Sequence, residues 1–510
     1  MPINLRATYR TSDEFSRFAT IILFGVILAA IVTTIFLSPT LVFALLIGVA
    51  SLVVTFMRPT YSLAFLLLYL PLEPFILKWI PDDIYVFARF FSETLIYLLA
   101  AAVIWKLISR AERYKVTRAD LPFILFVLMI IVSAVLNFIQ PLQASIGARQ
   151  ILRFMLLFFI TVQLAPSKIW LRNLFIGLFA ILALQITLGY AQTLFGESID
   201  GFLLPSEART YGEIQITSGT VQFWDPGKRV FGTLGRYDRL GTFMAILMLM
   251  LVALLYEPKF KEYHRPILVL LLAAMPVLIF SYSRSAWFGF LLGFFFIALY
   301  MKRDRRVLFA TSLAVGAIGI YLLGTGLVVN RLIDTPEQGI TERFFETFSV
   351  ARWRGEYYGL GRVFWIVQTV AVVTPASPLF GHGPGTYGGG AVAALGNTKV
   401  YDELGLPFGV YGTEGYIDNS WFSIWGETGT LGIIFFLWIY LTIFFACIRL
   451  YHKSSSPETQ TFALAVASMM IAMALNSFLA TFFEVRTLAP YIWVFGGMVI
   501  VLANEEEINL

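Results

Sequence analysis

Long apolar runs alternate with short polar segments along almost the whole chain. Runs of about 20 apolar residues are typical of membrane-spanning helices, whereas strands of a transmembrane barrel show about 10 residues of alternating character. The pattern predicts fourteen spans, at 18–37, 40–57, 61–80, 84–108, 121–139, 146–164, 169–194, 230–256, 266–283, 285–301, 307–328, 419–449, 461–483 and 487–503. We therefore expect an all-α, polytopic membrane protein that forms one membrane-embedded domain over 1–510.

The third predicted span, 61–80, contains an interruption. It carries the sequence Pro-Leu-Glu-Pro at 71–74, and a proline inside a helix removes a backbone donor and bends the helix. We expect this span to be kinked or re-entrant, because irregular backbone at membrane depth is tolerated where it is buried in protein.

The composition excludes a single large soluble core. Of the 510 residues, 58% are hydrophobic and only 14% are charged, compared with about 25% charged residues in soluble domains. Cys447 is the one cysteine of the sequence. Neither an intrachain disulfide nor a metal centre built from several cysteines is therefore possible.

The distribution of lysine and arginine predicts the orientation. With the N-terminus inside, every predicted inner loop is basic, and short outer turns such as 38–40 and 139–145 are nearly free of charge, as the positive-inside rule requires. Both termini are then cytoplasmic. Two outer segments are long, 195–229 and 329–418, the second between the eleventh and twelfth spans. We expect them to cap the bundle, with short helices in the second.

The second outer segment leads into the most distinctive stretch of the chain. An apolar helix is predicted at 361–373, and a turn region rich in proline and glycine follows at 375–390. A polar loop then continues to Asp418, where the next apolar run begins. Glycines in such a turn allow a close approach of one backbone to another.

Several arginines lie at the outer ends of predicted spans, against the positive-inside trend. They include Arg149, Arg153, Arg236, Arg239 and Arg284. Guanidinium groups bind phosphate through two parallel hydrogen bonds, so the set indicates an anionic ligand on the outer face. The alternative is snorkelling, or pairing with outer carboxylates such as Asp238 and Glu93.

Four motifs carry a resemblance to a known family. They lie at 229–245, 281–289, 378–387 and 418–432. By their order and sidedness, the chain from roughly 120 to 450 resembles the O-antigen ligase and polymerase superfamily of bacterial envelope polysaccharide assembly. The resemblance implies a membrane glycosyltransferase-C-like fold and a metal-independent enzyme without a cofactor. It also implies the bacterial cytoplasmic (inner) membrane, with the active site facing the outside or periplasm.

The resemblance implies a substrate and partners as well. The donor is a glycan on undecaprenyl pyrophosphate, the membrane supplies lipid, a flippase and a chain-length regulator work beside the enzyme, and no nucleic acid takes part. Arginines hold the pyrophosphate; the candidates are Arg149, Arg153, Arg229, Arg236, Arg239 and Arg284. Asp418 stands where ligases of the family have a histidine. This departure favours a polymerase of repeat units over a ligase.

The acceptor hydroxyl needs a base within hydrogen-bond reach. The outer candidates are Asp418, Glu414 and His382. Asp418 also has the position of a helix N-cap, for which aspartate is well suited, and His382 lies between glycines as a turn residue does. The helical spacing places Glu427 opposite Asp418, so we expect Glu427 to form an interhelical hydrogen bond.

Aromatic residues near these candidates have two interpretations. Trp421 and Trp425 share the side of Asp418 on the predicted helix, and Tyr387 lies in the glycine-rich turn. They are candidates for contacts to the acceptor or its sugars. Core packing or an interfacial aromatic belt is the favoured explanation for the two tryptophans, and a tight turn is the favoured explanation for Tyr387.

Two other functions remain open from the sequence. A ligase would transfer the glycan to lipid A or to protein, and a transporter of a small anion would also have an arginine-lined cavity. A transporter needs polar groups near the membrane midplane, whereas here the inner halves of the spans are almost entirely apolar. The sequence therefore favours the enzyme.

Overall fold

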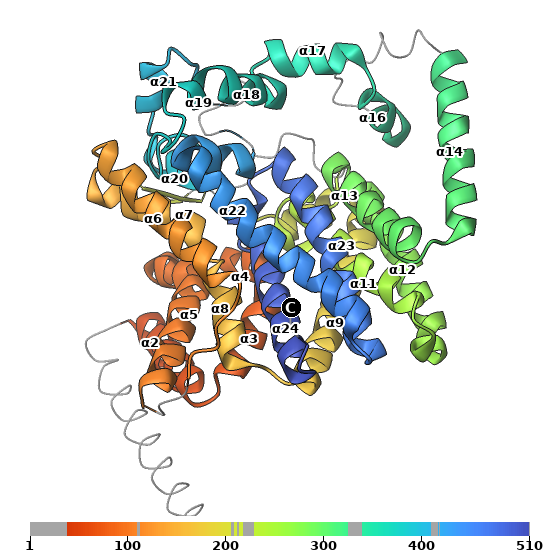
Figure 1. Ribbon diagram of the computed structural model, residues 1–510, viewed down its shortest axis with the longest axis horizontal. Helices are drawn as coiled ribbons and strands as arrows, with labels where there is room; N and C mark the ends of the chain where they lie inside the picture. The colour runs from red at the N-terminus through yellow and green to blue at the C-terminus, as the bar shows by residue number, and fades with distance from the viewer. Residues whose placement is uncertain are drawn as a thin grey trace, which may run out of the picture.

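The computed structural model describes residues 38–109, 113–205, 209–211, 214–217, 229–324, 339–409, 417 and 419–508. Helices dominate this part of the chain (Figure 1). A short antiparallel hairpin, formed by β1 (Arg209–Tyr211) and β2 (Ile214–Thr217), accompanies them. The all-α class predicted from the sequence is confirmed.

The helices of the first half have the following bounds. They are α2 (Pro39–Met57), α3 (Pro59–Tyr69), α4 (Glu73–Lys78), α5 (Asp82–Ser109), α6 (Asp120–Leu136), α7 (Pro141–Leu152), α8 (Leu156–Leu164), α9 (Lys168–Phe195), α10 (Glu197–Leu203), η1 (Gly232–Leu234) and α11 (Tyr237–Leu255).

The second half continues in the same way. Its helices are η2 (Pro258–Tyr263), α12 (His264–Phe280), α13 (Arg284–Phe295), η3 (Phe296–Met301), α14 (Arg305–Gly324), α16 (Ile340–Glu346), α17 (Val350–Tyr358), α18 (Arg362–Gln368), η4 (Thr369–Val373), α19 (Thr374–Ala376), α20 (Gly389–Leu395), α21 (Lys399–Glu403), α22 (Ser420–Lys453), α23 (Pro457–Leu479), η5 (Phe482–Glu484) and α24 (Ala489–Glu505).

The apolar helices identify a membrane protein. Among the described residues, 8 helices are long and apolar enough to cross a membrane, or up to 10 if each of two bent helix pairs is one span. The first predicted span, 18–37, lies outside the described residues. The count of fourteen and the sidedness therefore stay predictions.

Local sequence signals explain where the helices begin. Proline occupies the first turn of α2, α7 and α23, where its missing N–H would have no helical partner. The Ser283 hydroxyl caps α13 by accepting from the backbone N–H of Ala286. The Asn419 side chain caps α22 by accepting from the N–H of Phe422 at 3.0 Å. These two caps fix the helix starts nearest to the predicted site.

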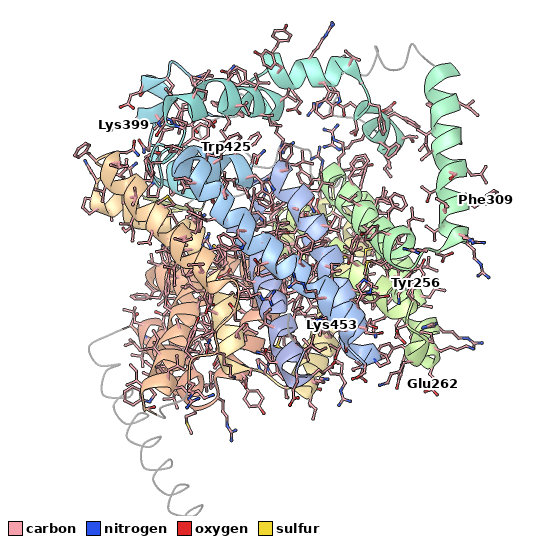
Figure 2. The ribbon with its side chains drawn as sticks, viewed as in Figure 1. Tyr256, Glu262, Phe309, Lys399, Trp425 and Lys453 are labelled. Carbon is pink, nitrogen blue, oxygen red and sulfur yellow. The ribbon has the colours of Figure 1, made fainter. Side chains whose placement is uncertain are left out.

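Two long helices organise the bundle. α22 and α23 pack against each other, α6 and α24 contact α22, and α11 and α13 contact α23. The short helices α16 to α21 form a layer across one end of the bundle (Figure 1). This layer, which we call the cap, comes from the segment 339–403. Lys399 and Trp425 lie at the cap end, and Glu262 and Lys453 lie at the opposite end (Figure 2).

The interruption predicted in the third span is confirmed. α3 ends at Tyr69, and α4 begins at Glu73 after a turn. The predicted helix at 361–373 also forms, as α18 followed by the π-helical η4.

Two predicted spans differ from the structure in their continuity. The span predicted at 146–164 is bent by 53° between α7 and α8. The span predicted at 419–449 is broken inside α22, where Gly429 has φ 70° and ψ −175°. Apolar periodicity identifies the long apolar segment, but it does not reveal a single glycine with non-helical φ and ψ inside it.

Candidate functional site

The break in α22 is filled by the glycine-rich turn (378–390). Beyond the break, the N–H groups of Thr430 and Leu431 donate to the carbonyls of Pro378 and Leu379, at 2.9 and 3.3 Å. In the other direction, the N–H of His382 donates to the carbonyl of Gly426 at 2.9 Å. The N–H of Gly383 donates to the carbonyl of Glu427 at 3.0 Å. Backbone groups that a broken helix would leave without partners are thus satisfied by the turn.

Glycine is required where the two backbones meet. Gly381 has φ 69°, and a Cβ there would lie 2.5 Å from the backbone of Glu427 and of Gly429. A Cβ at Gly426 would overlap the ring of Tyr387. The close approach expected of this turn is confirmed, and its partner is the helix that follows the loop.

The Glu427 carboxylate holds the middle of the turn. It is 2% exposed, and its Oε1 accepts from the backbone N–H of Gly388 at 3.0 Å and of Tyr387 at 3.3 Å. The expected interhelical hydrogen bond of this side chain is therefore wrong, because its partner is backbone of the turn. The helix break after Glu427 brings that backbone within reach.

The turn also fixes the residue before Asp418. Gly388 forms a parallel bridge with Ile417, which is fully buried. Asn419 then caps α22, so the cap considered for Asp418 is made by the next residue. The amide nitrogen of Asn419 is buried and has no hydrogen-bond partner among the described residues.

Two of the three proposed bases lie outside the described residues. These are Asp418 and Glu414. The third, His382, is half-buried, and its Nε2 lies 2.9 Å from the carbonyl oxygen of Val373. A carbonyl only accepts, so Nε2 carries the proton and Nδ1 is the basic nitrogen of this ring. His382 ties the turn to η4.

The aromatic candidates contribute to packing. Tyr387 is fully buried in the cap, where its hydroxyl pairs with Thr369 Oγ1 at 2.7 Å and its ring stacks on Tyr401. It is therefore not exposed to a sugar. Trp421 donates to the carbonyl of Ala474 and packs against the bundle core, whereas Trp425 is half-buried near the cap and donates to Thr430 Oγ1.

An arginine-rich group joins the start of α13 to the cap. We call it the Glu346 cluster; it contains Arg229, Arg284, Arg343, Glu346, Arg352 and Glu356. Arg284 Nη1 lies 2.8 Å from Oε2 of Glu346, whose other oxygen lies 3.4 Å from Arg352 Nη1. Arg352 also pairs with Glu356. Glu346 is 1% exposed, so these contacts form in a poorly hydrated place.

Two more arginines of this cluster lie close to Arg284. Arg343 donates from Nε to the carbonyl of Tyr282 at 2.9 Å. Burial and the nearby charges of Arg229 and Arg284 lower the pKa of Arg343 to about 10. Arg229 stacks on Tyr237 with its Cζ 4.5 Å from the ring centre. Such a gathering of positive charge favours an anion beside it.

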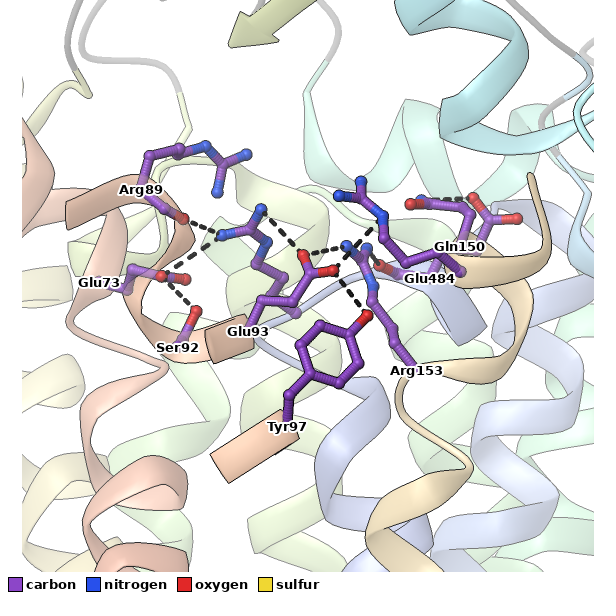
Figure 3. Close-up of polar contacts among 10 residues, drawn as sticks. Glu73, Arg89, Ser92, Glu93, Tyr97, Gln150, Arg153 and Glu484 are labelled. Atoms are coloured by element: carbon purple, nitrogen blue, oxygen red, sulfur yellow. Dashed lines mark hydrogen bonds and ion pairs between the residues drawn. The ribbon is translucent and has the colours of Figure 1, made fainter. Parts of the chain in front are cut away.

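Arg149 and Arg153 belong to a different group, drawn in Figure 3. We call it the Glu93 cluster; it contains Glu73, Arg89, Glu93, Arg149, Arg153 and Arg486. The Glu93 carboxylate lies 3.1 Å from Arg153, 3.4 Å from Arg149 and 3.8 Å from Arg486. The pairing with Glu93 considered from the sequence is confirmed for Arg149 and Arg153.

Arg236 and Arg239 belong to neither cluster and lie near Asp238. Arg236 Nε is 3.1 Å from Asp238 Oδ1, and its side chain is 45% exposed. Asp238 also attracts Arg239, which is within electrostatic range of Arg89. The structure thus divides the six candidate arginines into separate groups instead of one.

Sequence reasoning missed the partners of these arginines. Glu346, Glu356 and Arg352 lie on the cap helices α16 and α17, and Arg486 lies just before α24. The i, i+4 spacing of Arg352 and Glu356 is the one local signal for these pairs. The rest are contacts between distant segments.

The comparison with known families decides the class. Residues 266–437 match the family model described as O-antigen ligase. Over these residues the chain is similar to the O-antigen ligase family. This region includes Arg284, Glu346, the glycine-rich turn and Glu427, so the match confirms the resemblance to the O-antigen ligase and polymerase superfamily. It supports a ligase- or polymerase-type enzyme that acts on lipid-linked glycan at a membrane. No curated protein shows a significant match to the chain.

Proposed function

We propose that the protein polymerises oligosaccharide repeat units carried on undecaprenyl pyrophosphate, at the outer face of the bacterial cytoplasmic membrane. The observation that supports it is the Glu346 cluster at the start of α13. There Arg229, Arg284 and Arg343 gather, and Arg284 and Arg343 lie within the residues that match the O-antigen ligase model. Preorganised guanidinium groups stabilise a pyrophosphate leaving group without a metal.

The reaction is a displacement at the anomeric carbon of the donor glycan. The acceptor hydroxyl oxygen forms a bond to that carbon, while the bond from the carbon to the pyrophosphate oxygen breaks. The pyrophosphate leaves with the electron pair and is held by Arg284 and Arg229. The hydroxyl proton passes to the carboxylate of Asp418, which follows the Ile417–Gly388 bridge directly in the chain. Glu414 and Nδ1 of His382 are the other candidate bases.

A ligase is the second candidate, because the matching family model is described as O-antigen ligase. The two reactions differ in their products. Purified protein in nanodiscs, given lipid-linked repeat unit alone, should produce a ladder of chain lengths on a gel. A protein that gives no ladder, but transfers one glycan to added lipid A, is a ligase and contradicts the polymerase proposal.

The role of Arg284 is tested by Arg284→Lys, which keeps the charge but loses the planar fork. We expect turnover to fall by on the order of 100-fold, as when one preorganised donor to a developing anion is removed. The matched control is Arg354→Lys on the exposed surface of α17, which should polymerise at the wild-type rate. Wild-type turnover in Arg284→Lys would refute the specific contact with pyrophosphate.

A further inference from the structure

The Glu93 cluster lies apart from the Glu346 cluster. It is built from α4, α5, α7 and the segment between α23 and α24, whereas the Glu346 cluster is built from α13, α16 and α17, with Arg229 before η1. In Figure 1 α5 and α7 lie to the left of α22, whereas α13 lies to the right of α23. The donor site proposed above therefore leaves a second arginine group without an assigned role.

Arginines outnumber carboxylates at the centre of the Glu93 cluster. Three guanidinium groups, those of Arg149, Arg153 and Arg486, lie within 3.8 Å of the single carboxylate of Glu93. Arg486 reaches a second carboxylate, Glu73, at 3.6 Å. The Glu93 side chain is 5% exposed, so water screens these charges only weakly. An additional anion would be stabilised here by charge-assisted hydrogen bonds.

The cluster is open on one side. The Arg149 side chain is 35% exposed, in contrast to 5% for Arg153. An anion approaching from the cap end can therefore reach arginine nitrogens without unfolding the network.

The helices that supply these charges are interrupted at the cluster. Glu73 begins α4 after the break that follows α3, and Arg153 directly follows the last residue of α7, at the 53° bend into α8. Glu484 ends η5, and Arg153 donates to its backbone carbonyl at 2.9 Å. Interrupted membrane helices are a common way of building an ion or substrate site.

The cluster is also connected to the candidate active site. The Glu484 carboxylate accepts from the backbone N–H of Gly390 at 2.8 Å and from Gln150 at 2.9 Å. Gly390 lies two residues after Gly388, which forms the bridge to Ile417 beside Asp418. A ligand held at the Glu93 cluster would thus be held by the same framework that holds Ile417, the residue before the proposed base.

We propose that the Glu93 cluster binds the pyrophosphate of the acceptor, while the Glu346 cluster binds that of the donor. This inference rests on the proposed polymerase function, because joining two lipid-linked repeat units requires two lipid pyrophosphates at the membrane surface at the same time. Only the donor pyrophosphate leaves in the reaction. The acceptor pyrophosphate keeps its bond to its own glycan, so its site needs affinity and no chemistry.

The test compares two acceptors that differ only in the lipid. One is the lipid-linked repeat unit, and the other is the same oligosaccharide released from undecaprenyl pyrophosphate. For Arg149→Gln we expect the KM for the lipid-linked acceptor to rise roughly 10- to 100-fold, the effect of losing a hydrogen bond to a charged group. Transfer to the released oligosaccharide should be unchanged. Arg149 is chosen because its partial exposure lets the variant fold.

Binding supplies an independent measurement. Native mass spectrometry with farnesyl pyrophosphate should show two bound molecules for the wild type and for Arg354→Gln, the exposed control. It should show one for Arg149→Gln combined with Arg153→Gln. If that double variant does not fold, the ratio is read from Arg149→Gln alone, as a weaker second binding step.

Several outcomes would overturn the inference. Equal effects of Arg149→Gln on both acceptors would mean that the cluster only supports the fold. A selective effect that appears in nanodiscs containing phosphatidylglycerol, but disappears in pure phosphatidylcholine, would assign the site to a membrane headgroup. If the wild type makes no ladder, the polymerase proposal fails and this inference fails with it. A wild-type ladder with an unaffected Arg149→Gln variant refutes the second site alone.

Discussion

Replacing Glu427 tests whether the glycine-rich turn is held in the break of α22 by a buried carboxylate. In Glu427→Ala, the backbone donors of Gly388 and Tyr387 lose the oxygen that lies 3.0 and 3.3 Å away. Both residues are buried, so water cannot readily replace the lost carboxylate oxygen as the acceptor for these N–H groups. Glu427→Gln keeps a carbonyl oxygen that can accept from the same two N–H groups.

The expected magnitude follows from these two contacts. A buried donor left without a partner costs about 1–3 kcal/mol, so Glu427→Ala should lower the free energy of unfolding by about 2–6 kcal/mol. The amide of Glu427→Gln still accepts a hydrogen bond, and we expect a loss of about 1 kcal/mol. The difference between the two variants isolates the hydrogen bonds to the turn from the replacement of the carboxyl group itself.

The chain contains its own probe for this measurement. Cys447 is the one cysteine of the sequence and is fully buried, so it reacts with a thiol-specific dye only after unfolding. Unfolding of both variants is compared with Glu403→Gln, which removes an exposed carboxylate from α21. If Glu427→Ala unfolds at the same denaturant concentration as this control, the turn is held by something other than Glu427, and the account of the site is wrong.

Two further predictions concern the ends of helices. Asn419→Ala removes the cap of α22 and should lower the free energy of unfolding by about 1 kcal/mol. Asp418→Asn leaves that cap intact and should lower turnover by about 100- to 10,000-fold if Asp418 is the base. A gel-based chain-extension assay, with the Cys447 unfolding assay in parallel, separates the two effects, and an active Asp418→Asn variant would redirect the search to Glu414 and His382. At the other end of the bundle, desolvation raises the pKa of Glu506, but hydrogen bonds from Ser454, Thr459 and Lys168 outweigh it and hold that pKa below its usual 4.5. This contribution to the free energy of unfolding is present above pH 4.5 and is lost as the pH falls through the lowered pKa. Between pH 3 and 6, the free energy of unfolding should therefore depend less steeply on pH in Glu506→Gln than in the wild type. Identical pH profiles of the two proteins would refute this prediction.

Apolar periodicity and glycine content predicted most of the framework. The interruption at 71–74, the helix at 361–373 and the close approach of the glycine-rich turn are all present. Each depends on residues near one another in the sequence. The break at Gly429 was not predicted, because a glycine within an apolar run is compatible with a continuous helix. What breaks the helix is the turn, 44 to 52 residues earlier in the chain, whose backbone pairs with the groups freed by the break.

The arginine groups show a different limit. Their residue type and outer-end positions indicated an anion site, and the pairing of Arg149 and Arg153 with Glu93 was an open alternative. Sequence alone could not assign the arginines to two clusters, because their ion pairs join distant parts of the chain. Arg284 pairs with Glu346, 62 residues later, and Arg486 pairs with Glu93 from near the C-terminus. Such contacts depend on the tertiary fold, so one set of candidates became two clusters with separate partners.

The two clusters differ in what they attach to, and this difference has a mechanistic consequence. The Glu346 cluster joins α13 to α16 and α17, which belong to the cap. The Glu93 cluster joins helices of the bundle and reaches the cap through the contact of Glu484 with Gly390. A movement of α16 and α17 would therefore carry part of the proposed donor site and leave the proposed acceptor site in place. Release of the spent pyrophosphate, which must leave after each addition, then needs no disturbance of the glycan held at the Glu93 cluster. A polymerase needs this independence between its two lipid sites, because the growing chain must stay bound while one carrier is exchanged for the next.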